Sequence, residues 1–253
     1  MQLYEIYFSP TGGTKKVADI LTDGFESERM EIDITDCIDK LSVYNFEKED
    51  LAVIAIPSFG GRVPLSLNER LSLLNGNGAK AIIVCVYGNR AYEDTLAELE
   101  DIVKANGFHV ISAVAAIAEH SIAHQFATGR PDVTDYEQLK LFSEKIKEKL
   151  NKSDYAEPSI PGNRPYKIRG VSKIVPIAAN ECVKCGLCAE KCPVKAIDIN
   201  NPSLVDNNAC ISCMRCVSVC PHNACKVNNA LIETLGMALQ KACNIRKENE
   251  LYI

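Results

Sequence analysis

Two copies of one cysteine motif dominate the last third of the chain. The first runs from Cys182 to Pro193 and the second from Cys210 to Pro221, and both read C-x₂-C-x₂-C-x₃-C-P. Every cysteine of the second copy stands 28 positions after its counterpart in the first. This run is typical of proteins that hold two [4Fe–4S] clusters on cysteine thiolates. It predicts eight cluster ligands: Cys182, Cys185, Cys188, Cys192, Cys210, Cys213, Cys216 and Cys220.

Structural zinc is the alternative for closely spaced cysteines. A zinc site needs four ligands in total, usually as two separated pairs, and two runs of three cysteines plus one do not divide in that way. The same 28-residue repeat places Cys225 opposite Ile197, which predicts a packed thiol and not a ligand. The cysteines at 37, 85 and 243 lie outside any ligand spacing, and we expect them to behave as small buried apolar side chains.

Residues 177 to 227 resemble the bacterial-type 2[4Fe–4S] ferredoxins over both motifs. In those proteins the fourth cysteine of each run ligates the other cluster. The resemblance implies two crossed ligand sets. One set is Cys182, Cys185, Cys188 and Cys220, and the other is Cys210, Cys213, Cys216 and Cys192.

Composition narrows the class of protein. A length of 253 residues suits two domains, and 47% hydrophobic with 24% charged residues is ordinary for a globular chain. A net charge of −5 argues against nucleic-acid binding. The apolar runs fall short of the roughly 18 residues that cross a bilayer, and no secretory leader precedes Leu3. Twelve cysteines without an export signal indicate thiols kept for metal in a reducing cytoplasm, in an oxygen-poor habitat.

The N-terminus reads as a strand, a glycine-containing loop and a helix. The strand is Leu3 to Phe8, the helix is Lys15 to Phe25, and the loop between them holds Ser9, Thr11, Gly12, Gly13 and Thr14. Glycines let backbone amides approach an anion, hydroxyls donate to it, and the helix N-terminus adds a favourable dipole. Neither a Walker A loop nor a dinucleotide fingerprint is present, and a capped helix without a ligand is the alternative.

Strands alternate with helices through the following hundred residues. Strands are predicted at 29–34, 50–56, 80–86 and 109–118, and helices at 65–74, 92–106 and 135–151, with Asp132 or Thr134 as the cap of the last. In parallel sheets of this kind, ligands bind outside the carboxyl ends of the strands. The third and fourth strands end in the loops Pro57 to Pro64 and Tyr87 to Tyr92.

These three loops resemble those of flavodoxins. The first loop matches the family's [ST]-x-T-G-x-T phosphate loop, Phe59 falls where the family often has Trp, and Tyr92 falls on the aromatic of its G-D-x-x-Y pattern. The resemblance implies FMN with its ring between Phe59 and Tyr92, in an α/β doubly wound parallel sheet of five strands. The implied cofactor-binding residues are Ser9, Thr11, Gly12, Gly13, Thr14, Pro57, Ser58, Phe59, Gly60, Tyr87, Gly88, Asn89, Arg90 and Tyr92.

The sequence departs from flavodoxins in charge. Asn89 replaces the usual acidic residue, and Arg62 and Arg90 add cations to the same loops. A nearby positive charge favours the anionic form of the reduced flavin, so we expect a flavin that is less strongly reducing than in acidic flavodoxins. The alternative is that the two arginines are solvated or pair with the FMN phosphate. His120 and Ser121 follow the fifth strand, where they contact flavin or the ferredoxin domain, or serve as hydrogen-bonded scaffolding.

Nearly the whole chain resembles flavodoxin–ferredoxin fusion proteins of anaerobic bacteria and archaea. The predicted domains are a flavodoxin-like FMN-binding domain at 1–152, a linker at 153–176, a small α+β two-cluster ferredoxin domain at 177–228, and a C-terminal helix and tail at 229–253. Prolines and glycines interrupt the linker, which we expect to lie along the surface. The apolar stripe over 229–244 predicts a helix that docks one domain on the other, with a partner-binding helix as the alternative.

The two kinds of cofactor predict an electron-transfer protein in which the clusters relay single electrons to or from FMN. Its expected partner is a redox protein such as a ferredoxin-linked oxidoreductase, and the oligomeric state, including a homodimer, stays open. A flavin-dependent reductase of a quinone, flavin or dioxygen, fed by ferredoxin, is the second hypothesis, with His120, His124 or Tyr87 as its proton donor. A cluster-based redox sensor or assembly factor is the third.

Overall fold

The computed structural model describes residues 1–25, 27–36, 44–153, 155–170 and 174–253. Its larger unit is built on a sheet with the strand order β2-β1-β3-β4-β5-β8. The first five strands in that order are parallel, which confirms the predicted doubly wound sheet. They are β1 (Leu3–Tyr7), β2 (Arg29–Asp33), β3 (Leu51–Pro57), β4 (Lys80–Tyr87) and β5 (His109–Ile117).

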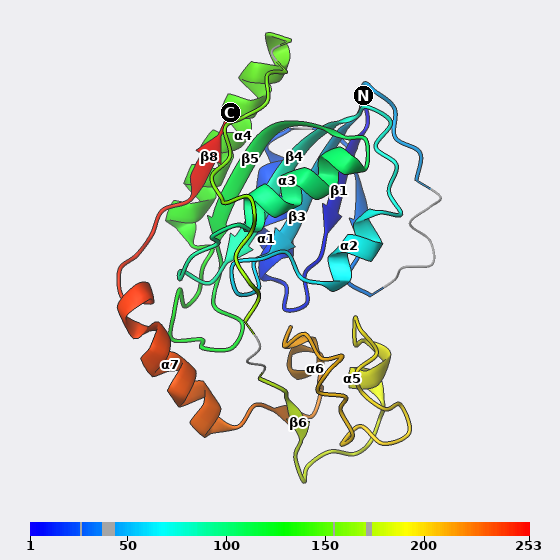
Figure 1. Ribbon diagram of the computed structural model, residues 1–253, viewed down its shortest axis with the longest axis vertical. Coiled ribbons are helices and arrows are strands. Elements are labelled where there is room, and N and C mark those ends of the chain that lie inside the picture. The colour runs from blue at the N-terminus through cyan, green and yellow to red at the C-terminus, as the bar shows by residue number, and fades with distance from the viewer. Residues whose placement is uncertain (26, 37–43, 154, 171–173) are drawn as a thin grey trace.

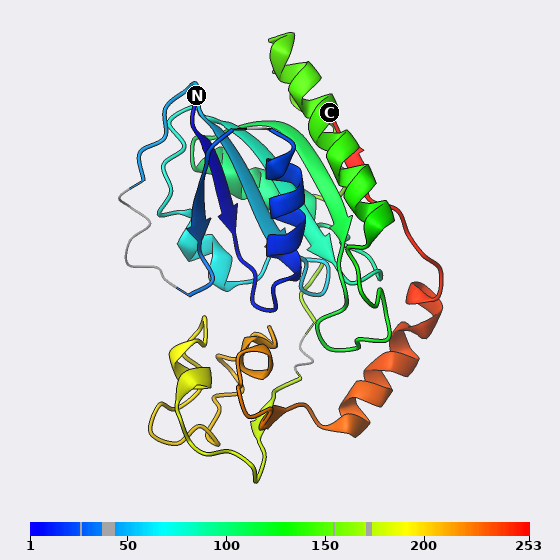
Figure 2. The same cartoon turned by 180° about the vertical axis from the view of Figure 1, so that it is seen from behind.

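Helices cover both faces of this sheet. Helices α1 (Gly13–Asp23) and α4 (Val133–Asn151) lie on one face, and α2 (Ser66–Leu71) and α3 (Thr95–Ala105) lie on the other (Figures 1 and 2). Side chains alternate along the strands, so Val53 packs with α1 while Ile54 packs with α2 and α3. Because both faces are covered, β3 and β4 are apolar almost throughout.

One predicted helix start is resolved in detail. Asp132 caps α4, since its carboxylate accepts a hydrogen bond from the backbone N–H of Asp135, and the Asp135 side chain accepts from the backbone N–H of Asp132. This reciprocal capping box selects Asp132 over Thr134 as the cap.

The smaller unit repeats itself with the period of the cysteine motifs. It contains β6 (Ile177–Ala178), α5 (Leu187–Glu190), α6 (Arg215–Ser218) and β7 (Cys225–Lys226), and β6 pairs antiparallel with β7. Helices α5 and α6 start 28 residues apart, each after a left-handed residue, Gly186 at φ 79° and Met214 at φ 62°. Ile197 and Cys225 share its core, as predicted from the repeat. The unit lies below the carboxyl ends of the parallel strands (Figures 1 and 2).

The linker contacts α3 and the residue that precedes it. Arg164 pairs with Asp101 at 2.8 Å and with Glu100 at 2.7 Å. The backbone N–H groups of Asn163 and Lys167 both donate to the carboxylate of Asp94, which precedes α3. The described part of this segment is therefore attached to the larger unit by specific polar contacts.

The C-terminal segment returns to the larger unit. Helix α7 (Asn229–Cys243) packs Leu235 and Leu239 against Ala123 and Phe126. After it, β8 (Glu250–Tyr252) pairs antiparallel with β5, a sixth strand that the sequence analysis did not predict. Helix α7 bridges the two units (Figure 1), in line with the docking interpretation. None of the helices in the described part of the chain is long and apolar enough to cross a membrane.

Candidate functional site

The loop between β1 and α1 is shaped to cradle an anion. Gly12 adopts φ 90°, a left-handed conformation that favours glycine, at the start of α1. The Ser9 hydroxyl accepts a hydrogen bond from the Lys15 backbone N–H at 2.9 Å, which closes the loop. A Cβ on Gly13 would lie 3.1 Å from the Cβ of Ala118, so the loop packs tightly against the end of β5. These features fit the phosphate of FMN.

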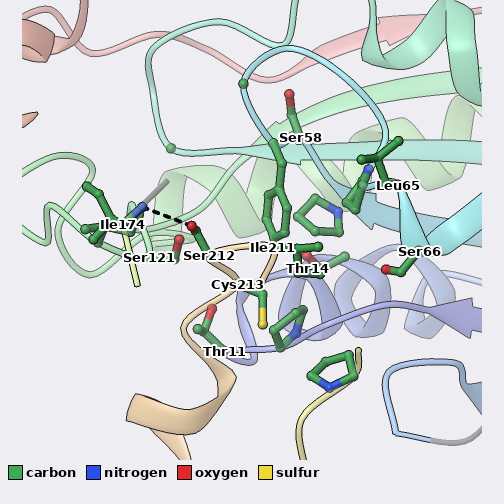
Figure 3. Close-up of a pocket in the computed structure, with 18 of the residues that line it drawn as sticks. Thr11, Thr14, Ser58, Leu65, Ser66, Ser121, Ile174, Ile211, Ser212 and Cys213 are labelled. Atoms are coloured by element: carbon green, nitrogen blue, oxygen red, sulfur yellow. Dashed lines mark hydrogen bonds between the residues drawn. The ribbon is translucent and has the colours of Figure 1, made fainter. Parts of the chain in front are cut away.

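A cavity of about 900 Å³ opens at the carboxyl edge of the sheet, between the two units. Its volume is within the range of small-molecule sites. Ten of the predicted cofactor-binding residues line it: Thr11, Gly13, Thr14, Pro57, Ser58, Phe59, Gly60, Tyr87, Gly88 and Arg90. The opposite wall comes from the smaller unit, with Pro193 and residues 208–213 (Figure 3). The linker adds Arg169 and Ile174, and α7 adds Leu235 and Leu239.

Tyr92 is not among the residues that line the cavity. Its hydroxyl lies 2.7 Å from the Tyr252 hydroxyl and donates to a Glu250 carboxylate oxygen at 2.7 Å. Its ring packs edge-on against Tyr87, with centroids 5.2 Å apart. Tyr92 thus lies outside the cavity lining, and strand β8 supplies polar partners for its hydroxyl.

Asn89 also faces the C-terminal segment and not the cavity. Its side-chain amide donates to the carbonyl oxygens of Cys243 and Ile245, both at 2.9 Å, and its Oδ1 accepts from the backbone N–H of Lys247 at 3.2 Å. Carbonyl groups at a helix C-terminus need donors, which an ionised carboxylate does not have. This explains an amide where flavodoxins have an acid. Ser9 and Gly12, the other two residues outside the lining, shape the phosphate loop.

The arginines predicted to act on the flavin are engaged by acids. Arg62 pairs with buried Glu98 at 2.8 Å and stacks over the Tyr166 ring, and it does not line the cavity. Arg169 from the linker shares Glu98 at 2.8 Å and reaches the cavity in its place. Arg90 lines the cavity and pairs with Glu93 at 2.8 Å. The positive charge expected from Arg62 is therefore directed at α3 and the linker.

The eight motif cysteines gather around two smaller cavities in crossed sets. Cys192, Cys210, Cys213 and Cys216 line one of them. Cys182, Cys185, Cys188 and Cys220 line the other, together with Cys225, which lies outside the motifs. Cys210 and Cys213 also line the large cavity between the units. The structure thus brings the cysteines together in the two groups that the crossed arrangement requires.

Backbone N–H groups point at the two crossing cysteines. The N–H of Ala196 donates to Cys192 Sγ at 3.3 Å, and 28 residues later the N–H of Ala224 donates to Cys220 Sγ at 3.3 Å. Hydrogen bonds of this kind stabilise thiolates, and they tune the potential of a bound cluster. The donor sets fit [4Fe–4S] clusters. Of the remaining cysteines, Cys85, Cys225 and Cys243 are buried, and Cys37 lies outside the described residues.

Polar contacts that the sequence analysis missed join the two units. The guanidinium of Arg215, between two cluster cysteines, reaches Asp36 at 2.8 Å, and Lys191 reaches the same carboxylate at 3.2 Å. Arg70, which is buried, donates to the carbonyl oxygens of Thr35 and Pro193. The contacts of Arg215 and Lys191 with Asp36, and of Arg70 with Pro193, each join residues more than 100 positions apart, for which local sequence carries no signal.

A chain with a phosphate loop, a flavin-sized cavity at the edge of a doubly wound sheet, and two sites that each gather four motif cysteines belongs to the flavin- and iron–sulfur-containing electron-transfer proteins. Known families agree: the Flavodoxin family matches residues 6–130, and the 4Fe-4S dicluster domain matches residues 181–224. The chain is a fusion of an N-terminal flavodoxin domain and a C-terminal two-cluster ferredoxin domain. Its cofactors are FMN and [4Fe–4S] clusters.

Several solved flavodoxins are similar to part of this chain. The Streptococcus pneumonia TIGR4 flavodoxin is 19% identical, with 59% of this chain and 99% of that chain covered and a TM-score of 0.42. A flavodoxin from the domain Archaea is 18% identical, with 60% and 99% covered and a TM-score of 0.43. The Fusobacterium nucleatum flavodoxin bound to flavin mononucleotide is 13% identical, with 59% and 99% covered and a TM-score of 0.39. No curated protein matches the chain.

Proposed function

We propose that the chain relays single electrons between FMN and an external redox protein through its two clusters. One observation carries this proposal: the cavity that holds the flavin loops is closed on its other side by Cys210 and Cys213. FMN can store two electrons and each cluster one, so a chain that joins them interconverts two-electron and one-electron steps. The cluster on Cys192, Cys210, Cys213 and Cys216 is then the one next to the flavin.

In this proposal the residues around the cavity bind and orient the flavin, and they exclude water from it. Thr11 and Thr14 place hydroxyls at the phosphate loop, and Phe59 offers an aromatic face. Leu235 and Leu239 of α7 form an apolar wall on another side. In this proposal the fourteen residues inferred from the sequence divide into ten that face the cofactor and four that shape or support the loops.

The cluster site of the first cysteine motif offers a route for electrons between the protein and an external partner. Cys185 is exposed, and its neighbour Val183 has 60% of its surface exposed, so the first-run motif is open to solvent. Its cysteines line a cavity separate from the one next to the flavin. We therefore place the order of transfer as partner, first-run cluster, second-run cluster and FMN, in either direction.

The residues named as proton donors for a reductase are poorly suited to that role. His124 is exposed, pairs with Glu119 at 2.7 Å and does not line the cavity. Burial raises the pKa of Tyr87 well above its usual range, so its hydroxyl holds its proton. His120 lines the cavity, but its Nδ1 accepts two backbone hydrogen bonds, which opposes protonation there. The relay needs no proton donor among these three.

Anaerobic rapid mixing tests the relay. The FMN- and cluster-loaded protein is mixed with a reduced ferredoxin, and separately with NADH, while cluster and flavin absorbance are followed. We expect cluster bleaching first and flavin reduction after it, with neither change from NADH. Added quinone should not be turned over at the tens per second usual for enzymes. Flavin reduction that precedes cluster reduction, or rapid quinone turnover, would contradict the relay.

A further inference from the structure

His120 is held in one tautomer by the loop that follows it. Its Nδ1 accepts hydrogen bonds from the backbone N–H groups of Ile122 at 3.2 Å and Ala123 at 3.1 Å. A ring nitrogen that accepts does not carry the hydrogen, so in the neutral ring the hydrogen is on Nε2. Burial, and then the charges of His124 and Arg90, lower the pKa of His120. The imidazole is thus a neutral donor.

Packing fixes where this donor lies. A Cβ built on Gly88 would be 2.7 Å from His120 Cδ2, so the imidazole rests directly on the backbone of the Tyr87–Arg90 loop, and only glycine leaves room for it. His120, Gly88 and Arg90 all line the large cavity. Among the described residues, no group of the protein hydrogen bonds to Nε2. The donor is therefore available to a ligand in the cavity.

The end of β5 spans both parts of the flavin site. Ala118 packs on Gly13 of the phosphate loop, whereas His120 packs on Gly88, in a loop assigned to the flavin ring. We propose that His120 Nε2–H donates a hydrogen bond to an acceptor atom on the polar edge of the isoalloxazine ring, as a flavin-positioning residue. This inference rests on the flavin site of the proposed function. It adds the segment after β5 as a fourth wall of that site.

Substitutions at residue 120 test the donor through the flavin midpoint potential. A donor at a ring acceptor stabilises the more electron-rich reduced flavin, so His120→Ala should lower the ratio of reduced to oxidised FMN affinity about tenfold. For a two-electron couple a tenfold ratio is about 30 mV, toward more negative potential. His120→Gln keeps a side-chain N–H and should recover most of this shift. His109→Gln, at the opposite end of β5 and outside the cavity lining, should leave the potential unchanged.

Two further measurements keep the outcome decisive if His120→Ala loses FMN. Nitrogen-15 NMR of the wild-type FMN complex should show hydrogen on Nε2 and an accepting Nδ1. Any change in affinity that His120→Gln causes relative to wild type should be equal for FMN and for riboflavin if the contact is to the ring. A hydrogen on Nδ1, an unchanged potential in His120→Ala, or a loss seen with FMN but not riboflavin would overturn the proposal.

These outcomes are separable from the relay. Cluster reduction by ferredoxin and the cluster signals in electron paramagnetic resonance do not depend on His120. A variant with a shifted flavin potential but the same order of reduction supports His120 as a donor and leaves the relay in place. If wild-type flavin is never reduced through the clusters, the relay fails, while the potential shift and the tautomer still decide the role of His120.

Discussion

Single side chains in this protein hold segments that are distant in sequence. Asn89 is 3% exposed, and its amide satisfies two carbonyl oxygens and one N–H of the C-terminal segment. Arg164 pairs the linker with α3, and Arg215 pairs the ferredoxin domain with Asp36. For buried Asn89, each hydrogen bond lost costs about 1–3 kcal/mol. The exposed pair of Arg164 with Asp101 contributes less, at most about 1 kcal/mol.

The substitution Asn89→Asp tests this at one residue. It removes the donor to the Cys243 and Ile245 carbonyls and directs a negative charge at them, so we expect a cost of about 2–4 kcal/mol. Amide hydrogen exchange should show faster opening of 236–252, with the strands β1 and β3 unaffected. The exposed Asn200→Asp is the control, and equal exchange in both variants would contradict the assignment.

The crossed cluster ligands make a prediction about two cysteines. Cys192 stands in the first motif but lines the cavity of the second-run cysteines, and Cys220 has the reverse placement. Cys192→Ser should therefore impair the cluster next to the flavin, and Cys220→Ser the outer one. Electron paramagnetic resonance of the reduced proteins, with iron analysis, distinguishes the clusters. Loss of the outer cluster in Cys192→Ser would show uncrossed ligation.

The phosphate loop makes a prediction about hydroxyl groups. Thr11→Val and Thr14→Val each remove a donor at the cavity, and hydrogen bonds to charged groups contribute about 1.5–3 kcal/mol. We expect FMN affinity to fall about tenfold or more for each, with cluster absorption intact, as measured by flavin fluorescence titration. Thr234→Val, whose hydroxyl bonds to the backbone of α7, is the matched control. Full affinity in the double variant would remove the phosphate-loop assignment.

At the level of elements, the local sequence pattern predicted the strands and helices whose burial is set by their own residues. Apolar runs and their spacing located the five parallel strands and α1 to α4, because burial on two faces leaves a clear signature. The 28-residue repeat located both cluster loops. The short β8 carries no such signature, since three residues gain strand structure only from pairing with β5. The hydrogen-bond partners of Tyr92 lie on that unpredicted strand, so the sequence of its own loop could not reveal them.

The linker makes a prediction about pH. The hydrogen bond from Arg164, followed by that from Tyr166, lowers the pKa of Asp101 below its usual value. Because the pKa of Asp101 is lower in the folded state, its ionised carboxylate stabilises the attachment at every pH above the unfolded pKa of about 3.9. This contribution is lost only as the pH falls through the lower folded pKa. Hydrogen exchange of 155–170, corrected for intrinsic rates, should therefore be equally protected at pH 7 and pH 5.

Replacement of Arg164 should instead release the linker from α3 at neutral pH. Arg164→Ala breaks the contacts with Asp101, Glu100 and the carbonyl of Ala97, so exchange in 155–170 should rise at pH 7. Arg246→Ala, which breaks a pair with Asp132 at the other tether, is the matched control and should leave 155–170 protected. Protection that is lost between pH 7 and pH 5 in the wild type would show that another group controls the attachment.

At the scale of the whole molecule, two tethers and one polar interface set the position of the ferredoxin domain. The linker enters it from α3, and α7 with β8 returns from it to β5. At the interface, Asp36 forms ion pairs with Arg215 and Lys191, and Arg70 donates a hydrogen bond to the carbonyl oxygen of Pro193. Because Cys210 and Cys213 line the flavin cavity in this arrangement, we expect domain position to control electron transfer in the proposed relay.

Charge reversal at Asp36 tests that control. Asp36→Lys sets three cations together, Arg215 and Lys191 included, and like charges at close range disfavour the docked arrangement. We expect flavin reduction through the clusters to slow at least severalfold at low salt, with cluster reduction unchanged. Glu28→Lys makes the same charge change at an exposed position of the flavodoxin domain and should have no effect. Because salt screens repulsion at the partly exposed interface, the defect should shrink as ionic strength rises. An equal rate in Asp36→Lys and wild type at low salt would mean that the tethers alone hold the flavin cavity against Cys210 and Cys213.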